Sequence, residues 1–147
     1  MLLQANAVFE RMQENILSDE ITRLFKEKDF IELNECWLLI NHRETMKRIL
    51  RCYGDQVKRE ILTTVSETPM TISKIIEKTG FPTSTIYREV DELVADGLLF
   101  RSGYSKSAKK TAVKLMALIQ NMKVEIDGNH ISVLVKTNNA YNDVFGI

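Results

Sequence analysis

The sequence has few cysteines and no long apolar run, and each shortage excludes a class of protein. Its two cysteines, Cys36 and Cys52, cannot form the disulfide framework of a small secreted domain, so a reducing compartment is expected. The densest apolar run, Cys36–Ile40, is far shorter than the roughly 18 residues that a membrane-spanning helix needs. The N-terminal residues MLLQANAVFERMQ have no basic region ahead of their apolar residues, unlike a signal peptide. We therefore expect a cytoplasmic protein with no membrane partner.

Motifs of catalysis and cofactor binding are also missing. The chain has no glycine-rich phosphate loop, no nucleophile and histidine in a familiar order, and no paired carboxylates in a plausible cleft. Cys36, His42 and Cys52 do not follow a zinc-binding spacing, so we interpret them as structural residues. His130 is interpreted as a packing residue, and Trp37 as part of the core or of a dimer interface. We therefore expect a protein that is not an enzyme and carries no metal and no cofactor.

The formal net charge is zero, yet the charges are unevenly distributed along the chain. No Asp or Glu occurs between Gly97 and Val124, and the rest of the chain has 14 basic and 20 acidic residues, a balance of −6. A local basic patch on an otherwise acidic chain is typical of a nucleic-acid contact surface. The six basic residues of this stretch are Arg101, Lys106, Lys109, Lys110, Lys114 and Lys123.

The first third of the chain combines helical and ambiguous segments. Apolar residues at helical spacing predict helix over residues 1–28. Residues 30–41 fit either a helix capped by Asp29 or two short strands, and the two-strand interpretation is slightly favoured. From Thr45 the helical pattern is clear again, and Gly54 is expected to end that helix.

Three helices are predicted between Asp55 and Gly97. Asp55 and Thr71 are expected to cap the first two, and Gly80 is expected to end the second. The third helix is predicted over residues 82–96. The apolar residues expected on the buried faces are Val57, Ile61, Leu62, Val65, Ile72, Ile75, Ile76, Ile86, Val90, Leu93 and Val94.

Beyond Gly97 the apolar period changes from that of a helix to that of a strand. Asp127-Gly128 favours the tight turn of a β-hairpin. The predicted segments are a strand over 98–104, a basic turn over 105–109, a returning strand over 111–119, and a hairpin with strands over 122–126 and 130–137. This order predicts an α+β fold: a winged helix-turn-helix, with a three-helix core and a β-wing, between a mainly helical N-terminal extension and a C-terminal β-hairpin.

A resemblance to known regulators is carried by the segment TISKIIEKTGFPTSTIYREVDELVADGLLFRSGYSKSAKK. It resembles the archaeal and bacterial winged helix-turn-helix transcriptional regulators of the ArsR-like and MarR-like kind. Gly80 matches the turn glycine, Ser84–Arg88 the opening of the recognition helix, and Asp96–Leu99 the exit into the wing. The match covers residues 55–110 and implies a DNA-binding protein that regulates transcription. Metal-sensing ArsR-like proteins carry a paired-cysteine motif, whereas no cysteine follows Cys52 here, so metal sensing by that site is not implied.

The resemblance implies that the third helix (82–96) enters the major groove of double-stranded DNA. Arg88 is the best candidate for reading a guanine; the alternative is an ion pair with Asp91 or Glu92 on a solvated helix face. The basic wing (101–110) is expected on the DNA backbone or in the minor groove; the alternative is a solvated turn. The predicted DNA contacts are Thr83, Ser84, Thr85, Tyr87, Arg88, Arg101, Tyr104, Lys106, Lys109 and Lys110.

The remaining predictions concern the flanking segments. We expect three regions: an N-terminal extension (1–54) for dimerisation or effector binding, the DNA-binding domain (55–119), and a C-terminal hairpin and tail (120–147). The extension carries more apolar residues than a solvated segment would, so we expect it to hold a homodimer together. The alternative is a monomer in which this segment folds back on its own winged helix. No motif identifies an effector. The alternative functions are a general transcription component or protein-interaction module that docks through the winged helix, and RNA binding.

Overall fold

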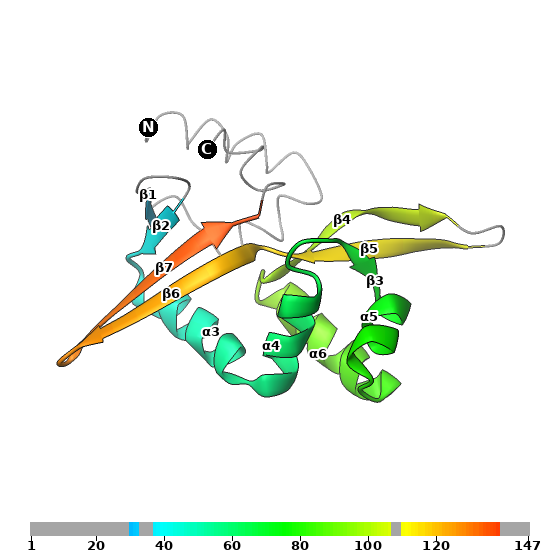
Figure 1. Cartoon of the computed structure of the whole chain (residues 1–147), viewed down its shortest axis with the longest axis horizontal. Helices are drawn as coiled ribbons and strands as arrows, with labels where there is room; N and C mark the ends of the chain where they lie inside the picture. The colour runs from blue at the N-terminus through cyan, green and yellow to red at the C-terminus, as the bar shows by residue number, and fades with distance from the viewer. Residues whose placement is uncertain (1–29, 33–36, 107–109, 139–147) are drawn as a thin grey trace.

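The computed structural model describes residues 30–32, 37–106 and 110–138, with side chains from Trp37 onward, and the predicted helices over 1–28 lie outside them. These residues form an α+β fold, as expected, with four helices and two antiparallel sheets (Figure 1). The elements are β1 (Phe30–Glu32), β2 (Trp37–Ile40), α3 (Arg43–Gly54), α4 (Gln56–Thr64), β3 (Met70–Thr71), α5 (Ile72–Thr79), α6 (Thr83–Ala95), β4 (Leu99–Lys106), β5 (Thr111–Ala117), β6 (Ile119–Asp127) and β7 (His130–Thr137).

The helix boundaries follow from local capping chemistry. The Asp55 carboxylate accepts a hydrogen bond from the backbone N–H of Lys58 at 2.9 Å, as predicted for an N-cap. Thr71 caps α5 in the same way, and Gly80 ends α5 with a φ of 74°, a left-handed conformation that glycine adopts without strain. The cap of α3 is provided by the ring of His42 and was not expected from the sequence.

The sheets join segments that are distant in the sequence. One sheet has the strand order β3-β5-β4, and the other has the order β1-β2-β7-β6. The two-strand interpretation of residues 30–41 is therefore confirmed, since β1 and β2 pair antiparallel. In the second sheet β2 pairs with β7, which brings Trp37 opposite Lys136. A single sheet thus contains strands from both the predicted N-terminal extension and the predicted C-terminal hairpin.

Several predicted strand boundaries were wrong, and one of them is the end of the returning strand, which lies at Ala117 and not at residue 119. The first strand of the basic hairpin extends to Lys106, so Ser105 and Lys106 belong to β4 and not to the turn. The first strand of the last hairpin begins at Ile119 rather than at residue 122. In both the extension of the first strand to Lys106 and the earlier start at Ile119, the backbone pairing continues along residues with polar side chains, for example between Lys106 and Thr111. Such residues do not show the apolar alternation from which a strand is predicted.

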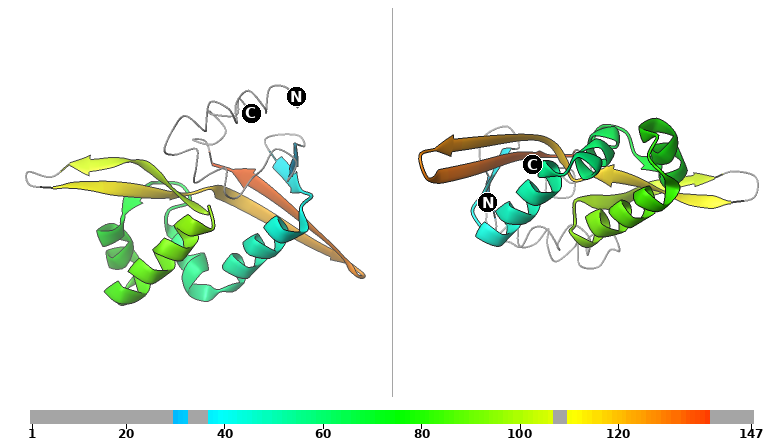
Figure 2. Two further views of the ribbon diagram at one scale, coloured as in Figure 1. Left: turned by 180° about the vertical axis from the view of Figure 1, so that it is seen from behind. Right: turned by 90° about the horizontal axis from the view of Figure 1, so that it is seen from below.

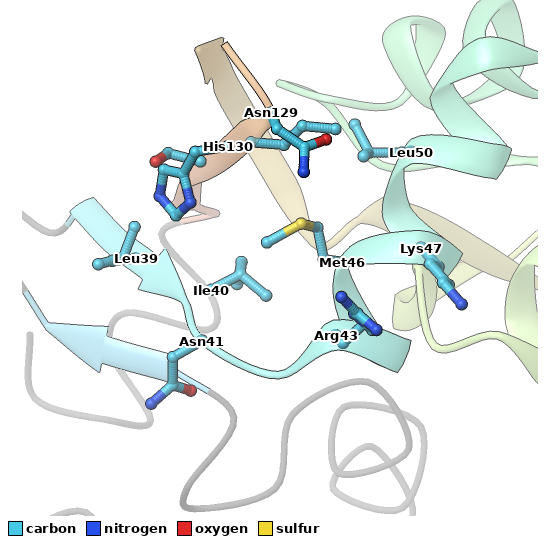
Figure 3. A pocket seen from close by; sticks show the side chains of 11 residues that line it. Leu39, Ile40, Asn41, Arg43, Met46, Lys47, Leu50, Asn129 and His130 are labelled. Atoms are coloured by element: carbon cyan, nitrogen blue, oxygen red, sulfur yellow. The ribbon is translucent and has the colours of Figure 1, made fainter. Parts of the chain in front are cut away.

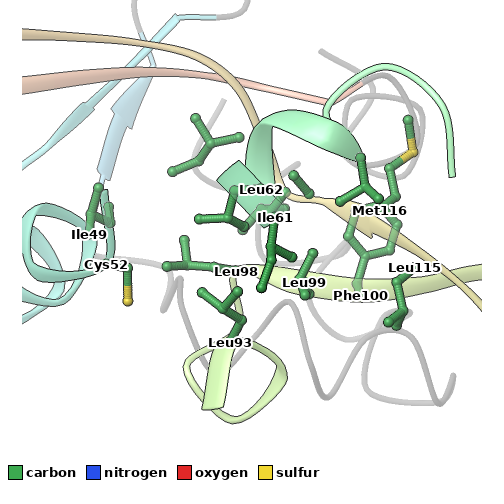
Figure 4. Close-up of a cluster of buried hydrophobic side chains, with 14 of the residues drawn as sticks. Ile49, Cys52, Ile61, Leu62, Leu93, Leu98, Leu99, Phe100, Leu115 and Met116 are labelled. Atoms are coloured by element: carbon green, nitrogen blue, oxygen red, sulfur yellow. The ribbon is translucent and has the colours of Figure 1, made fainter. Parts of the chain in front are cut away.

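One buried core connects the helices with both sheets (Figure 4). Most predicted core positions are buried, whereas Val57, Ile72, Ile76 and Val94 are only half-buried. The core also includes residues of β2, α3 and β7, so the apolar side chains of residues 37–54 are covered largely by their own chain. These additional core residues are Leu38, Ile40, Ile49, Cys52, Val133 and Val135. Among the described residues, no helix has both the length and the apolar character needed to cross a membrane.

Candidate nucleic-acid interface

The orientation of α6 is set by its apolar stripe. Ile86, Val90 and Leu93 are buried against the core, which anchors one side of the helix. The opposite side turns Ser84, Tyr87, Arg88 and Asp91 toward the surface, as the sequence predicted, and Tyr87 is 49 % exposed. A rigid helix with a fixed phase is the kind of element that can present side chains to a DNA groove.

The first turn of α6 leaves its backbone donors uncapped by a side chain. Pro82 occupies the N-cap position and has no side-chain group to accept a hydrogen bond, although its carbonyl accepts from the Ile86 N–H at 3.1 Å. Thr83 and Ser84 are exposed, and Thr85 is half-buried. The three hydroxyl residues predicted to meet phosphate oxygens therefore lie at a helix start whose N–H groups have no side-chain cap.

Arg88 is held only loosely. Its guanidinium donates to the Glu89 carboxylate at 3.5 Å, and 64 % of its side chain is exposed. The ion-pair partner is therefore Glu89 rather than the Asp91 or Glu92 considered from the sequence. A long, solvent-screened contact of this kind stabilises little, so the guanidinium can exchange it for a ligand at small cost.

Lys58 of α4 neutralises the acidic side of α6. Its ammonium forms ion pairs with Glu89 and, at 2.7 Å, with Glu92. Burial would lower the pKa of Lys58, but the hydrogen bonds to these two carboxylates outweigh it and raise that pKa. The same hydrogen bond lowers the pKa of Glu92. This cluster was not expected from the sequence, because its members lie on different helices. Its effect is to turn two of the acids of α6 toward α4.

The β4–β5 hairpin carries the remaining predicted contacts. Arg101, Tyr104, Lys106 and Lys110 are all exposed, with Tyr104 exposed by 63 %. The pairing register shifts between Arg101 and Tyr104, where Gly103 has a φ of 103°, so the hairpin contains an irregularity near its middle. Lys109 lies outside the described residues. The described cations therefore follow the hairpin from its base at Arg101 toward its tip.

A groove connects the two predicted contact elements. Its volume is about 390 Å³, and it lies between the start of α5, the exposed side of α6, and the β4–β5 hairpin. Tyr87 and Asp91 line it from α6, and Arg101 lines it from β4. The structure thus brings residues of the third helix and of the basic hairpin to one surface, although they are 10 or more positions apart in the sequence.

The residues considered for metal binding have structural roles where the structure describes them. The His42 ring accepts a hydrogen bond from the Thr45 backbone N–H at 3.3 Å. The buried Cys52 thiol donates to the Asp96 carboxylate at 3.5 Å, and burial together with the Asp96 charge raises the pKa of Cys52 to about 12. Cys36 lies outside the described residues. Within the described ranges, no three His, Cys, Asp or Glu side chains lie together as metal ligands would.

A second groove lies on the other side of the molecule, between β2, α3 and the turn that joins β6 to β7 (Figure 3). Its volume is about 510 Å³, and its apolar lining includes Met46, Leu50 and Ile131. His130, which was expected to be a packing residue, is exposed at the edge of this groove. Trp37 is half-buried, and the Lys123 ammonium lies 4.5 Å from the centre of its ring.

The chain matches no protein-family model and no curated protein sequence.

Proposed function

We propose that this chain is a transcriptional regulator that binds double-stranded DNA through a winged helix-turn-helix. The observation that carries the proposal is the joint position of α6 and the β4–β5 hairpin. The exposed side of α6 and the longest stretch without acidic residues border the same groove. In this proposal α4, α5 and α6 are the three-helix core, α6 enters the major groove, and the hairpin is the wing.

The side chains of α6 suit base and phosphate recognition. Arg88 has the length and the fork of donors to contact a guanine edge in two places. The hydroxyl groups of Thr83, Ser84 and Thr85, with the uncapped N–H groups of the first turn, suit phosphate oxygens. The ion pairs of Lys58 support this role, since they keep Glu89 and Glu92 from repelling a nearby phosphate backbone.

The hairpin suits backbone contact. Lys106 and Lys110 lie near its tip, and Arg101 and Tyr104 lie on the strand that leads there. Cations with no acid nearby in sequence attract phosphates of any base sequence. A protein-docking role for the same surface is less favoured, because lysine is depleted in protein–protein interfaces.

The proposal is tested by titrating the full-length protein into fluorescent nucleic acids at several salt concentrations. We expect tighter binding to duplex DNA than to single-stranded DNA or duplex RNA. The slope of log affinity against log salt concentration should be about −2 or steeper, as expected for several phosphate contacts. Equal binding to all three nucleic acids, or no binding to any, would contradict the proposal; the second result would favour the protein-docking alternative.

A more specific prediction concerns Arg88. Arg88→Ala should weaken binding to a selected high-affinity duplex by about 1–3 kcal/mol, which is about 5-fold to 150-fold, while binding to random duplex falls much less. The melting temperature should change little, since the Arg88 side chain is 64 % exposed. Arg43→Ala, on the exposed start of α3, is the matched control and should leave both affinities unchanged. A uniform loss on both duplexes would assign Arg88 to a phosphate and not to a base.

A further inference from the structure

Strand β6 forms one edge of the four-stranded sheet. The strand order β1-β2-β7-β6 places it at the end opposite β1, and no strand of the described chain pairs with its outer side. Figure 2 shows the β6–β7 hairpin extending away from the helices, with β6 along its outer side. In an antiparallel strand the N–H and C=O groups of alternate residues face the outer side, so β6 presents a row of donors and acceptors.

The end of this hairpin carries apolar side chains that the described chain leaves exposed. Val124 is 41 % exposed, Ile126 is 71 % exposed, and Ile131 of β7 is 38 % exposed. These residues lie on the same face of the sheet as Val133, which pairs with Val124 and is buried in the core. The apolar face of the sheet therefore extends beyond the buried core, toward the end of the hairpin. There it borders the apolar groove beside α3 (Figure 3).

We propose that this edge pairs with β6 of a second copy of the chain, antiparallel and with Val124 on the two-fold axis. In this register Lys123 lies opposite Glu125 of the second copy, and Glu125 lies opposite its Lys123. Met122 lies opposite Ile126 of the second copy on the other face. The two ion pairs and the apolar contacts are then repeated by symmetry, as a two-fold interface requires.

Charge selects this register among the symmetric possibilities. Residues directly opposite each other on neighbouring strands lie on the same face of the sheet. A two-fold axis between two copies of β6 must therefore lie at one residue, which is then opposite its own copy. An axis at Lys123 or at Glu125 would place like charges directly opposite each other, which destabilises a strand pair. An axis at Met122 would place Ile126 opposite Leu118, which lies outside β6 and is buried in the core. Only Val124 pairs unlike charges and also covers Ile126.

The resulting dimer has a continuous eight-stranded sheet, in which Val124 lies opposite its own copy and Ile126 of each hairpin lies opposite Met122 of its partner. This inference goes beyond the proposed function and does not depend on DNA binding. It also assigns the dimer contact to β6 instead of to residues 1–54.

Disulfide trapping tests the register in the full-length chain. Cys36 is replaced with serine in every variant, and Cys52 stays in place because it is buried. Val124→Cys should give a covalent dimer under mild oxidation, since directly opposite residues have Cα atoms about 4.5–5.5 Å apart, within disulfide reach. Ile126→Cys is the matched control and should remain monomeric on a denaturing gel, because its copy lies four strand positions away, about 13 Å. Equal trapping of both variants, or of neither, would overturn the register.

Charge reversal gives a second, independent measurement by sedimentation equilibrium. Lys123→Glu or Glu125→Lys alone should weaken the dimer at least tenfold, because each places like charges opposite each other twice. The double variant Lys123→Glu/Glu125→Lys restores unlike pairs and should recover most of the affinity. A dimer unaffected by the single changes would overturn the proposal, and so would a wild-type chain that is monomeric at tens of micromolar. Melting curves of each variant confirm that it is folded.

Discussion

Replacing Lys106, Lys109 and Lys110 with alanine is expected to lower the affinity for any DNA duplex by about 100-fold or more at roughly 0.1 M salt. Each lysine that neutralises a phosphate releases a bound counterion, and three such contacts change the slope of log affinity against log salt by about two to three units. Because phosphates are the same in every sequence, specific and random duplexes should weaken together. Fluorescence anisotropy over a range of salt concentrations measures both the affinity and the slope.

The control for this triple variant removes the same charge from another surface. Arg43, Lys47 and Arg51 are exposed along α3, away from the β4–β5 hairpin (Figure 1). Changing all three to alanine lowers the net charge equally, yet it should leave the salt slope nearly unchanged. If both triple variants lose affinity to the same degree, the loss is caused by the change in net charge. The proposed contact between the hairpin and the DNA backbone would then be wrong.

Lys58→Met is expected to lower the free energy of unfolding by about 2–3 kcal/mol, the largest effect on stability that we predict for a charged residue. The Lys58 and Glu89 side chains are only 15 % and 12 % exposed, so removing the ammonium leaves a carboxylate nearly buried and without its strongest partner. The double variant Lys58→Met/Glu89→Met should recover most of the loss, since it removes the unpaired charge and retains apolar volume. Urea unfolding of the wild type, of Lys58→Met and Glu89→Met alone, and of the double variant measures the coupling.

Lys74→Met provides the matched control for Lys58. The ion pair of Lys74 with Glu77 joins side chains that are 47 % and 69 % exposed, so its loss should cost no more than about 0.5 kcal/mol. The pH dependence gives a further check. The lowered pKa of Glu92 stabilises the native state above the ordinary pKa of a glutamate, about 4.3, and this contribution is lost as the pH falls through the native pKa. Lys58→Met should therefore reduce the loss of stability in acid; an unchanged acid profile would contradict the role of Lys58.

The helices of the α4–α6 region were predictable because their signals are local. The cap at Asp55, the left-handed Gly80 and the apolar stripe of α6 each depend on residues within one or two turns. The phase of that stripe also predicted which side chains of α6 reach the surface. The predicted ends of the strands were less accurate. Whether Ser105 and Lys106 belong to a strand depends on their pairing with the opposite strand, which local sequence does not show.

By itself, the sequence determined the order of the described helices and of the strands other than β3, the exposed side of α6, and the absence of acids along the basic hairpin. The short strand β3, which pairs with β5, was not predicted. All of these follow from short-range periodicity, capping and charge. Only the tertiary structure decided that β2 pairs with β7, that Lys58 neutralises Glu89 and Glu92, and that β6 is left at an edge. These contacts join residues that are tens of positions apart, and many partners would satisfy the same local pattern. The packing of the common core selects one of them, because burying Leu38, Ile61, Leu93 and Val135 together requires these elements to meet.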